Sequence, residues 1–133
     1  MYDPPQYSAA PDFSLLQAPA HDVQINWIRH ATFLIQLGSR YQILIDPVLE
    51  VIDGYTGRFM KYADIGKLYA EPPLTARDLP FSDGAEDPAK DRINIVAISH
   101  DHYDHLNWNT INQLPVDTHF YVPLGLEDNF PCL

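Results

Sequence analysis

Residues 99–105, with the sequence SHDHYDH, concentrate metal-binding side chains in one short stretch. Imidazole nitrogen and carboxylate oxygen are both zinc ligands, and a catalytic zinc ion takes several of them around an open coordination position. The candidates within these residues are His100, His102, Asp104 and His105. We therefore interpret the stretch as a metal-binding loop, and the alternative interpretation is a polar surface loop.

The segment before this loop favours the metal-binding interpretation. Residues 93–98, INIVAI, form a short apolar run rich in Ile and Val, which is typical of a buried strand. The edge where such strands end is the usual place for chemistry in α/β sheets. In an extended segment His100 and His102 point to the same side, so both can reach one ion. Asp104 and His105 follow after a turn and could face a second ion.

An antiparallel meander is predicted upstream of this core strand. Alternating or apolar runs predict strands over residues 23–28, 32–37 and 41–45, and Gly38 suits a hairpin turn. The third strand stops at Asp46-Pro47, because proline cannot donate to a central ladder. For Asp46, a supporting position beside the metals and an ordinary strand-end turn are equally acceptable interpretations. For His30, the alternatives are a place at the mouth of the site and a structural histidine.

The remaining segments carry weaker signals. We expect residues 1–22 to form an extended arm, with a disordered tail as the alternative. Residues 48–90 form a long irregular connection with a short helix near 59–69, and the aromatic residues of 55–69 suit either an acyl chain or ordinary packing. Further elements are expected as a helix over 107–114, a strand over 118–122 and a helix beginning in 125–130.

Composition narrows the classes of function. The formal net charge is −10 and the eight basic residues are scattered, which argues against a nucleic-acid partner. Cys132 is the single cysteine, so no intramolecular disulfide can form. We see no secretory signal and no apolar run of the roughly 20 residues that cross a bilayer. We therefore expect a cytoplasmic protein, with local membrane association left open.

The sequence resembles a known superfamily at the loop. The pattern His-x-His-x-Asp-His, complete in residues 100–105, is similar to the signature of the metallo-β-lactamase fold. Four further phrases resemble the branch that contains N-acylphosphatidylethanolamine phospholipase D and its bacterial relatives. These are HATFLI at 30–35, ILIDP at 43–47, PLTARDLP at 73–80 and YVPLGL at 121–126. The likeness begins at about Val23, and Arg29 stands where relatives usually have glycine.

The resemblance implies an α/β protein, a sandwich with the layer order αβ/βα built from two similar halves. Residues 23–133 would be the first half: the antiparallel meander, and then the core strand leading to the metal loop. It also implies two zinc ions, one held by His100 and His102 and the other by Asp104 and His105. Asp104 would additionally orient or deprotonate the attacking water, which makes it the implied catalytic residue.

The same resemblance implies further ligands, namely a His, a bridging Asp and a final His, C-terminal to this segment. We therefore expect the isolated chain to be a truncated form that binds metal weakly. Its exposed sheet face would favour self-association or a complementing C-terminal half. The implied reaction is hydrolysis of a phospholipid phosphodiester, with N-acylphosphatidylethanolamine as substrate and peripheral membrane contact. The alternatives are a lactonase, a small phosphodiesterase, or a non-catalytic fragment, and the sequence does not identify substrate-binding residues.

Overall fold

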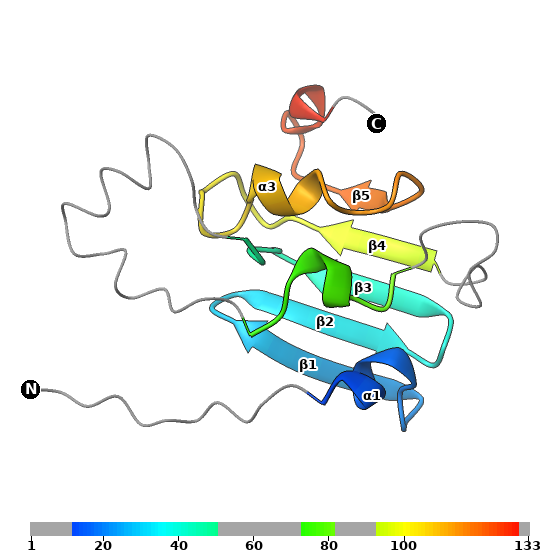
Figure 1. Ribbon diagram of the computed structural model, residues 1–133. Coiled ribbons are helices and arrows are strands. Elements are labelled where there is room, and N and C mark those ends of the chain that lie inside the picture. The colour runs from blue at the N-terminus through cyan, green and yellow to red at the C-terminus, as the bar shows by residue number, and fades with distance from the viewer. Residues whose placement is uncertain (1–11, 51–72, 82–92, 131–133) are drawn as a thin grey trace, which may run out of the picture.

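A five-stranded mixed sheet organises the chain (Figure 1). The computed structural model describes residues 12–50, 73–81 and 93–130. The strands lie in chain order, the first three antiparallel and the last three parallel. They are β1 (Val23–Arg29), β2 (Thr32–Leu37), β3 (Tyr41–Ile45), β4 (Ile93–Ala97) and β5 (His119–Tyr121). The predicted meander and core strand are therefore confirmed, as part of an α/β fold.

The register of the sheet aligns its most buried side chains. Leu34 pairs with Leu44, and Leu44 pairs with Val96, so the three form a row across β2, β3 and β4. All three are 0% exposed. Side chains alternate between the two faces of a strand, so this row defines the covered face of the sheet. Gly38, with φ of 56°, makes the β2–β3 turn as predicted.

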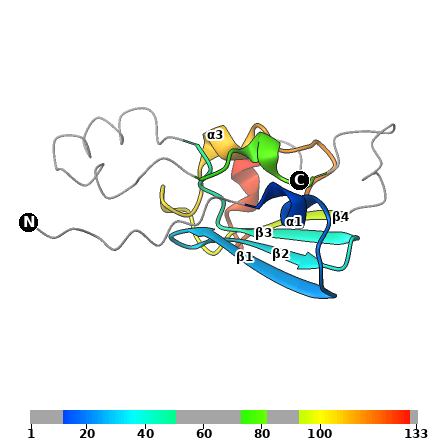
Figure 2. The same cartoon turned by 60° about the horizontal axis from the view of Figure 1, so that its bottom comes forward.

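Short helices cover that face of the sheet. Figure 2 shows them on the same side of the strands, with the other side bare. They are α1 (Phe13–Gln17), the 3-10 helix η2 (Ala76–Asp78), α3 (Trp108–Ile111) and the 3-10 helix η3 (Glu127–Asn129). Buried side chains from α1 and α3, and from the residues that directly follow η2 and η3, join the strand residues in one hydrophobic core that includes Leu16, Ile111, Leu79 and Phe130.

Polar side chains also cross the covered face, at the end of the sheet that lies under α1. Gln24 pairs with Gln36, Gln36 with Gln42 and Gln42 with Asn94, so an amide row spans four strands. Gln36 is 0% exposed, and its Nε2 donates to the Leu16 carbonyl at 2.7 Å and to Gln42 Oε1 at 2.9 Å. The hydrogen bond from Gln36 to Leu16 therefore holds α1 on the sheet, although the buried Gln42 Nε2 of the same row has no hydrogen-bond partner among the described residues.

The opposite face of the sheet is apolar and uncovered within the described part of the chain. Val23, Ile25 and Trp27 on β1 are 57%, 63% and 64% exposed, and Tyr121 on β5 is 65% exposed. We call this surface the outer face. Its exposure agrees with the expectation of an uncovered sheet face.

Several local expectations need correction. Residues 13–17 form α1 rather than part of an extended arm, with Asp12 Oδ1 accepting from the Ser14 N–H at 3.0 Å as the N-cap. The helix expected over 107–114 is one turn long, and the helix expected within 125–130 is only a 3-10 turn. The helix near 59–69 and the aromatic residues of 55–69 lie outside the described residues.

None of the helices in the described ranges is both long enough and apolar enough to cross a membrane.

Candidate metal centre

The metal-binding loop leaves the sheet at the carboxyl end of β4. Because β3 and β4 are parallel, their ends meet at one edge, and the Asp46 N–H donates to the Ala97 carbonyl at 2.9 Å. The loop then folds back on itself: the N–H groups of His105 and Leu106 both donate to the His102 carbonyl, at 2.9 and 2.8 Å. The sequence predicts a turn before Asp104 and His105, but the observed turn, residues 103–105, contains both of them.

The imidazole rings of the loop converge. The ring centroids of His100 and His102 are 4.5 Å apart, as expected if both point to the same side. The centroid of His100 lies 4.0 Å from that of His105. Three imidazole rings, with His100 in contact with the other two, give a nitrogen-rich surface, which suits a borderline-soft cation such as zinc.

Asp46 lies beneath this surface and is 3% exposed. Its Oδ2 is 2.8 Å from His105 Nδ1 and accepts a hydrogen bond from the Ser99 hydroxyl at 2.7 Å. Its Oδ1 accepts a hydrogen bond from the Ser99 N–H, also at 2.7 Å. Burial, the largest influence, raises the pKa of Asp46. The hydrogen bonds from His105 and Ser99 together outweigh it and leave the pKa of Asp46 below its ordinary value. Asp46 is therefore ionised at neutral pH and accepts a hydrogen bond from the Nδ1–H of His105. This leaves Nε2 of His105 available as a ligand.

The backbone of Asp46 is held in an unusual conformation. Its φ is 42°, in the left-handed region that residues with a β-carbon rarely adopt. The buried hydroxyl of Thr32 donates to the Asp46 carbonyl at 2.7 Å and accepts from the Val48 N–H at 3.3 Å. Thr32 therefore fixes the turn that presents the Asp46 carboxylate to the loop.

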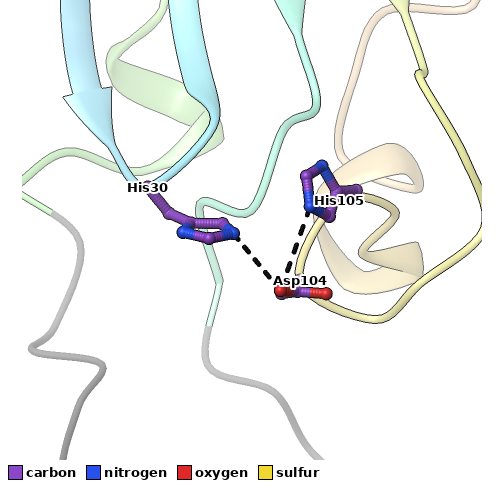
Figure 3. A group of neighbouring side chains, drawn as sticks. All are labelled: His30, Asp104 and His105. Carbon is purple, nitrogen blue, oxygen red and sulfur yellow. Dashed lines mark ion pairs between the residues drawn. The ribbon is translucent and has the colours of Figure 1, made fainter.

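His30 reaches the same place from the β1–β2 connection. Figure 3 shows it facing Asp104, with His105 directed at the same carboxylate oxygen. His30 Nε2 is 3.2 Å from Asp104 Oδ2, and His105 Nε2 is 3.9 Å from the same oxygen. Among the described residues, His30, Asp104 and His105 form a group whose candidate ligand atoms all lie within 4.8 Å of one another.

This donor set fits a zinc ion. Bonds of about 2.0–2.1 Å in a tetrahedron place neighbouring ligand atoms roughly 3.4 Å apart. The observed separations of 3.2 and 3.9 Å bracket that value. The ring of His100 contacts those of His102 and His105, but His100 and His102 lie outside this three-residue group. Of the four ligands expected from the sequence, the group therefore contains two, and its third member is His30.

Two contributors were missed by reasoning from the sequence. Ser99 and Thr32 both hold Asp46 by hydrogen bonds, but serine and threonine at strand ends are too common to stand out. A usable signal for Ser99 was its place at the end of the strand predicted beside Asp46. His119 is exposed on β5, and His21 is exposed before β1.

Comparison with known proteins assigns the family. Residues 24–128 match the sequence profile of the beta-lactamase superfamily domain. The chain belongs to the beta-lactamase superfamily, whose members are generally hydrolytic. The match covers the five strands and the metal-binding loop.

Three mycobacterial proteins are similar to this chain. They are the uncharacterized proteins Rv0906 and MT0929 of two strains of Mycobacterium tuberculosis and Mb0930 of Mycobacterium bovis. Each is 29% identical over 116 residues, which is 85% of this chain and 26% of the relative. The chain therefore spans about a quarter of the length of these relatives.

Proposed function

We propose that this chain supplies part of the active site of a zinc-dependent phosphodiester hydrolase. The observation that carries the proposal is the contact of the Asp46 carboxylate with Nδ1 of His105, at 2.8 Å. A carboxylate on the far nitrogen is the usual support of a metal-ligating histidine, because it fixes the ring orientation and raises ligand basicity. Membership in a generally hydrolytic superfamily supports the same reaction class.

The proposal assigns a role to each side chain of the loop. His100 and His102 would hold one ion, and Asp104 and His105 would hold a second. Two such ions would supply Lewis acidity, which promotes ionisation of water and offsets the charge that develops on a phosphoryl oxygen. Asp104, whose side chain is 20% exposed, would orient the attacking water or accept its proton.

The substrate class follows from the resemblance of this chain to the phospholipase branch. We propose a phospholipid phosphodiester, N-acylphosphatidylethanolamine, whose hydrolysis gives an N-acylethanolamine and phosphatidic acid. The substrate would be met at a membrane surface by peripheral contact. Additional ligands would come from a complementing C-terminal half, because a catalytic zinc ion normally has three protein ligands.

The proposal is tested by zinc binding and hydrolysis measured on the same preparations. The purified chain is loaded with zinc and assayed on N-acylphosphatidylethanolamine in mixed micelles, on bis(p-nitrophenyl) phosphate and on an acyl-homoserine lactone. We expect slow zinc-dependent phosphodiester hydrolysis, because this chain supplies only part of the active site, and we expect Asp104→Asn to abolish it. The exposed Asp117 provides the matched control, and Asp117→Asn should leave the rate unchanged.

The alternatives give different results in this assay. Hydrolysis of the lactone alone would identify a lactonase and contradict the phosphodiesterase assignment. Zinc binding without hydrolysis of any of the three substrates would identify a non-catalytic fragment that needs a complementing chain. Absence of zinc binding would contradict the metal centre itself.

A further inference from the structure

We propose that His30 is a protein ligand of the ion held by Asp104 and His105, and that its Nε2 is the ligand atom. The inference rests on the proposed metal centre and adds a residue to it from a distant part of the chain. It replaces the expectation that this chain offers each ion only two ligands. With His30 included, the second ion has three protein ligands and an open position, the arrangement of a catalytic zinc.

The positions of the three side chains support coordination of one ion. His30 Nε2 and His105 Nε2 approach the same atom, Asp104 Oδ2, at 3.2 and 3.9 Å. The ring centroids of His30 and His105 are 5.2 Å apart, with the ring planes at 68°. Figure 3 shows both imidazoles directed at the same carboxylate oxygen of Asp104. An ion between them would need only small side-chain adjustments to reach about 2.0–2.2 Å from each ligand.

The backbone that carries His30 is also specialised. His30 has a φ of 42°, and together with Asp46 it is one of the two non-glycine residues in the described ranges with positive φ. The indole N–H of Trp27 donates to the His30 carbonyl at 2.9 Å and fixes this conformation. Strained backbone that surrounding contacts hold in place is concentrated at functional sites. Both strained residues of the described ranges present their side chains to the metal-binding loop.

A simple ion pair is the competing explanation for the contact. The side chain of His30 is 42% exposed and that of Asp104 is 20% exposed. An exposed ion pair contributes little to stability, so it would not by itself compensate for the strain at His30. A ligand role accounts for both the strain and the common target of the two imidazoles.

The test uses two substitutions at His30 and one control in the full 133-residue chain. His30→Asn suits the left-handed backbone, because asparagine tolerates positive φ, but it removes the imidazole. His30→Cys keeps a zinc ligand while removing any ion pair with Asp104. His119 is exposed on β5, so His119→Asn is the matched control. Circular dichroism verifies that each variant folds.

Zinc affinity is measured by competition with a chromophoric chelator, and coordination by the visible spectrum of the cobalt-substituted chain. Loss of a residue that merely supports a ligand costs about 10–100-fold in affinity, so loss of a ligand should cost at least about a hundredfold. We expect His30→Asn to show that loss with an altered cobalt spectrum. We expect His30→Cys to recover tight binding with a new sulfur-to-cobalt band, and His119→Asn to match the unmodified chain.

The outcomes separate this inference from the function on which it rests. Unchanged zinc affinity in His30→Asn overturns the ligand assignment, as does a His30→Cys variant that binds as weakly as His30→Asn without the sulfur band. In both cases the unmodified chain still binds zinc and the proposed metal centre stands. If the unmodified chain binds no zinc, both the metal centre and the ligand assignment fail.

Discussion

The carboxylate of Asp46 contacts His105 across 59 residues of sequence, with Oδ2 at 2.8 Å from Nδ1. Asp46→Asn keeps the size of the side chain but removes its negative charge. We expect zinc affinity to fall by about 10–100-fold, because the neutral amide supports the basicity and orientation of His105 less well. Isothermal titration with zinc measures the change.

Asp117→Asn provides the control for Asp46→Asn, since Asp117 is exposed outside the loop. Equal zinc affinity in the two variants would contradict a supporting role for Asp46. A selective loss in Asp46→Asn would show that the buried carboxylate acts through His105.

Thr32→Val tests how the Asp46 turn is held. The hydroxyl of Thr32, 0% exposed, makes hydrogen bonds to the backbone on both sides of Pro47. Valine has nearly the same shape but leaves the Asp46 carbonyl and the Val48 N–H without this partner. We expect the free energy of unfolding to fall by about 1–3 kcal/mol, measured by urea denaturation.

Ser39→Ala is the comparison for Thr32→Val, because Ser39 is exposed in the β2–β3 turn. Removal of this exposed hydroxyl should change the free energy of unfolding by no more than about 0.5 kcal/mol. A Thr32→Val variant as stable as Ser39→Ala would contradict the structural role given to the threonine.

Ile25→Lys tests the outer face. Ile25 is 63% exposed on β1, the edge strand, between Val23 and Trp27. Exposed apolar faces and unpaired edges promote association, so we expect the isolated chain to self-associate with increasing concentration. Ile25→Lys should shift the chain toward monomer in sedimentation velocity experiments.

The control for the outer face is Val116→Lys, which places the same charge on a fully exposed loop residue. This variant should associate like the unmodified chain. A monodisperse monomer at all concentrations of the unmodified chain would contradict the prediction.

The strands and the loop could be predicted because their signals are local. Period-two alternation, Gly38 and the Asp46-Pro47 stop are each visible within a few residues, and all three strands of the meander are found where they were expected. Helix α1 could not be predicted in this way. Its five residues follow a segment rich in proline and alanine, and the amide of Gln36 from β2 holds it in place.

The candidate site could be predicted only in part, because some of its residues are brought together by contacts between distant parts of the chain. His100, His102, Asp104 and His105 are neighbours along the chain, so their pattern is evident. The approach of His30 to Asp104 depends on the order of the strands and on the backbone of one tight turn. Neither property has a local signature, so the sequence favoured a structural histidine over a place at the mouth of the site.

Two polar systems flank strand β3, one near its start and one directly after its last residue, Ile45. Gln42 belongs to the amide row, Asp46 supports His105, and the fully buried Leu44 lies between them. At about 3.3 Å per residue, the two polar side chains are roughly 13 Å apart. The apolar middle of the strand separates the amide row that holds α1 from the carboxylate that supports His105. Substitutions that change how α1 is held on the sheet can therefore accumulate during evolution without moving the Asp46 carboxylate under the metal-binding loop.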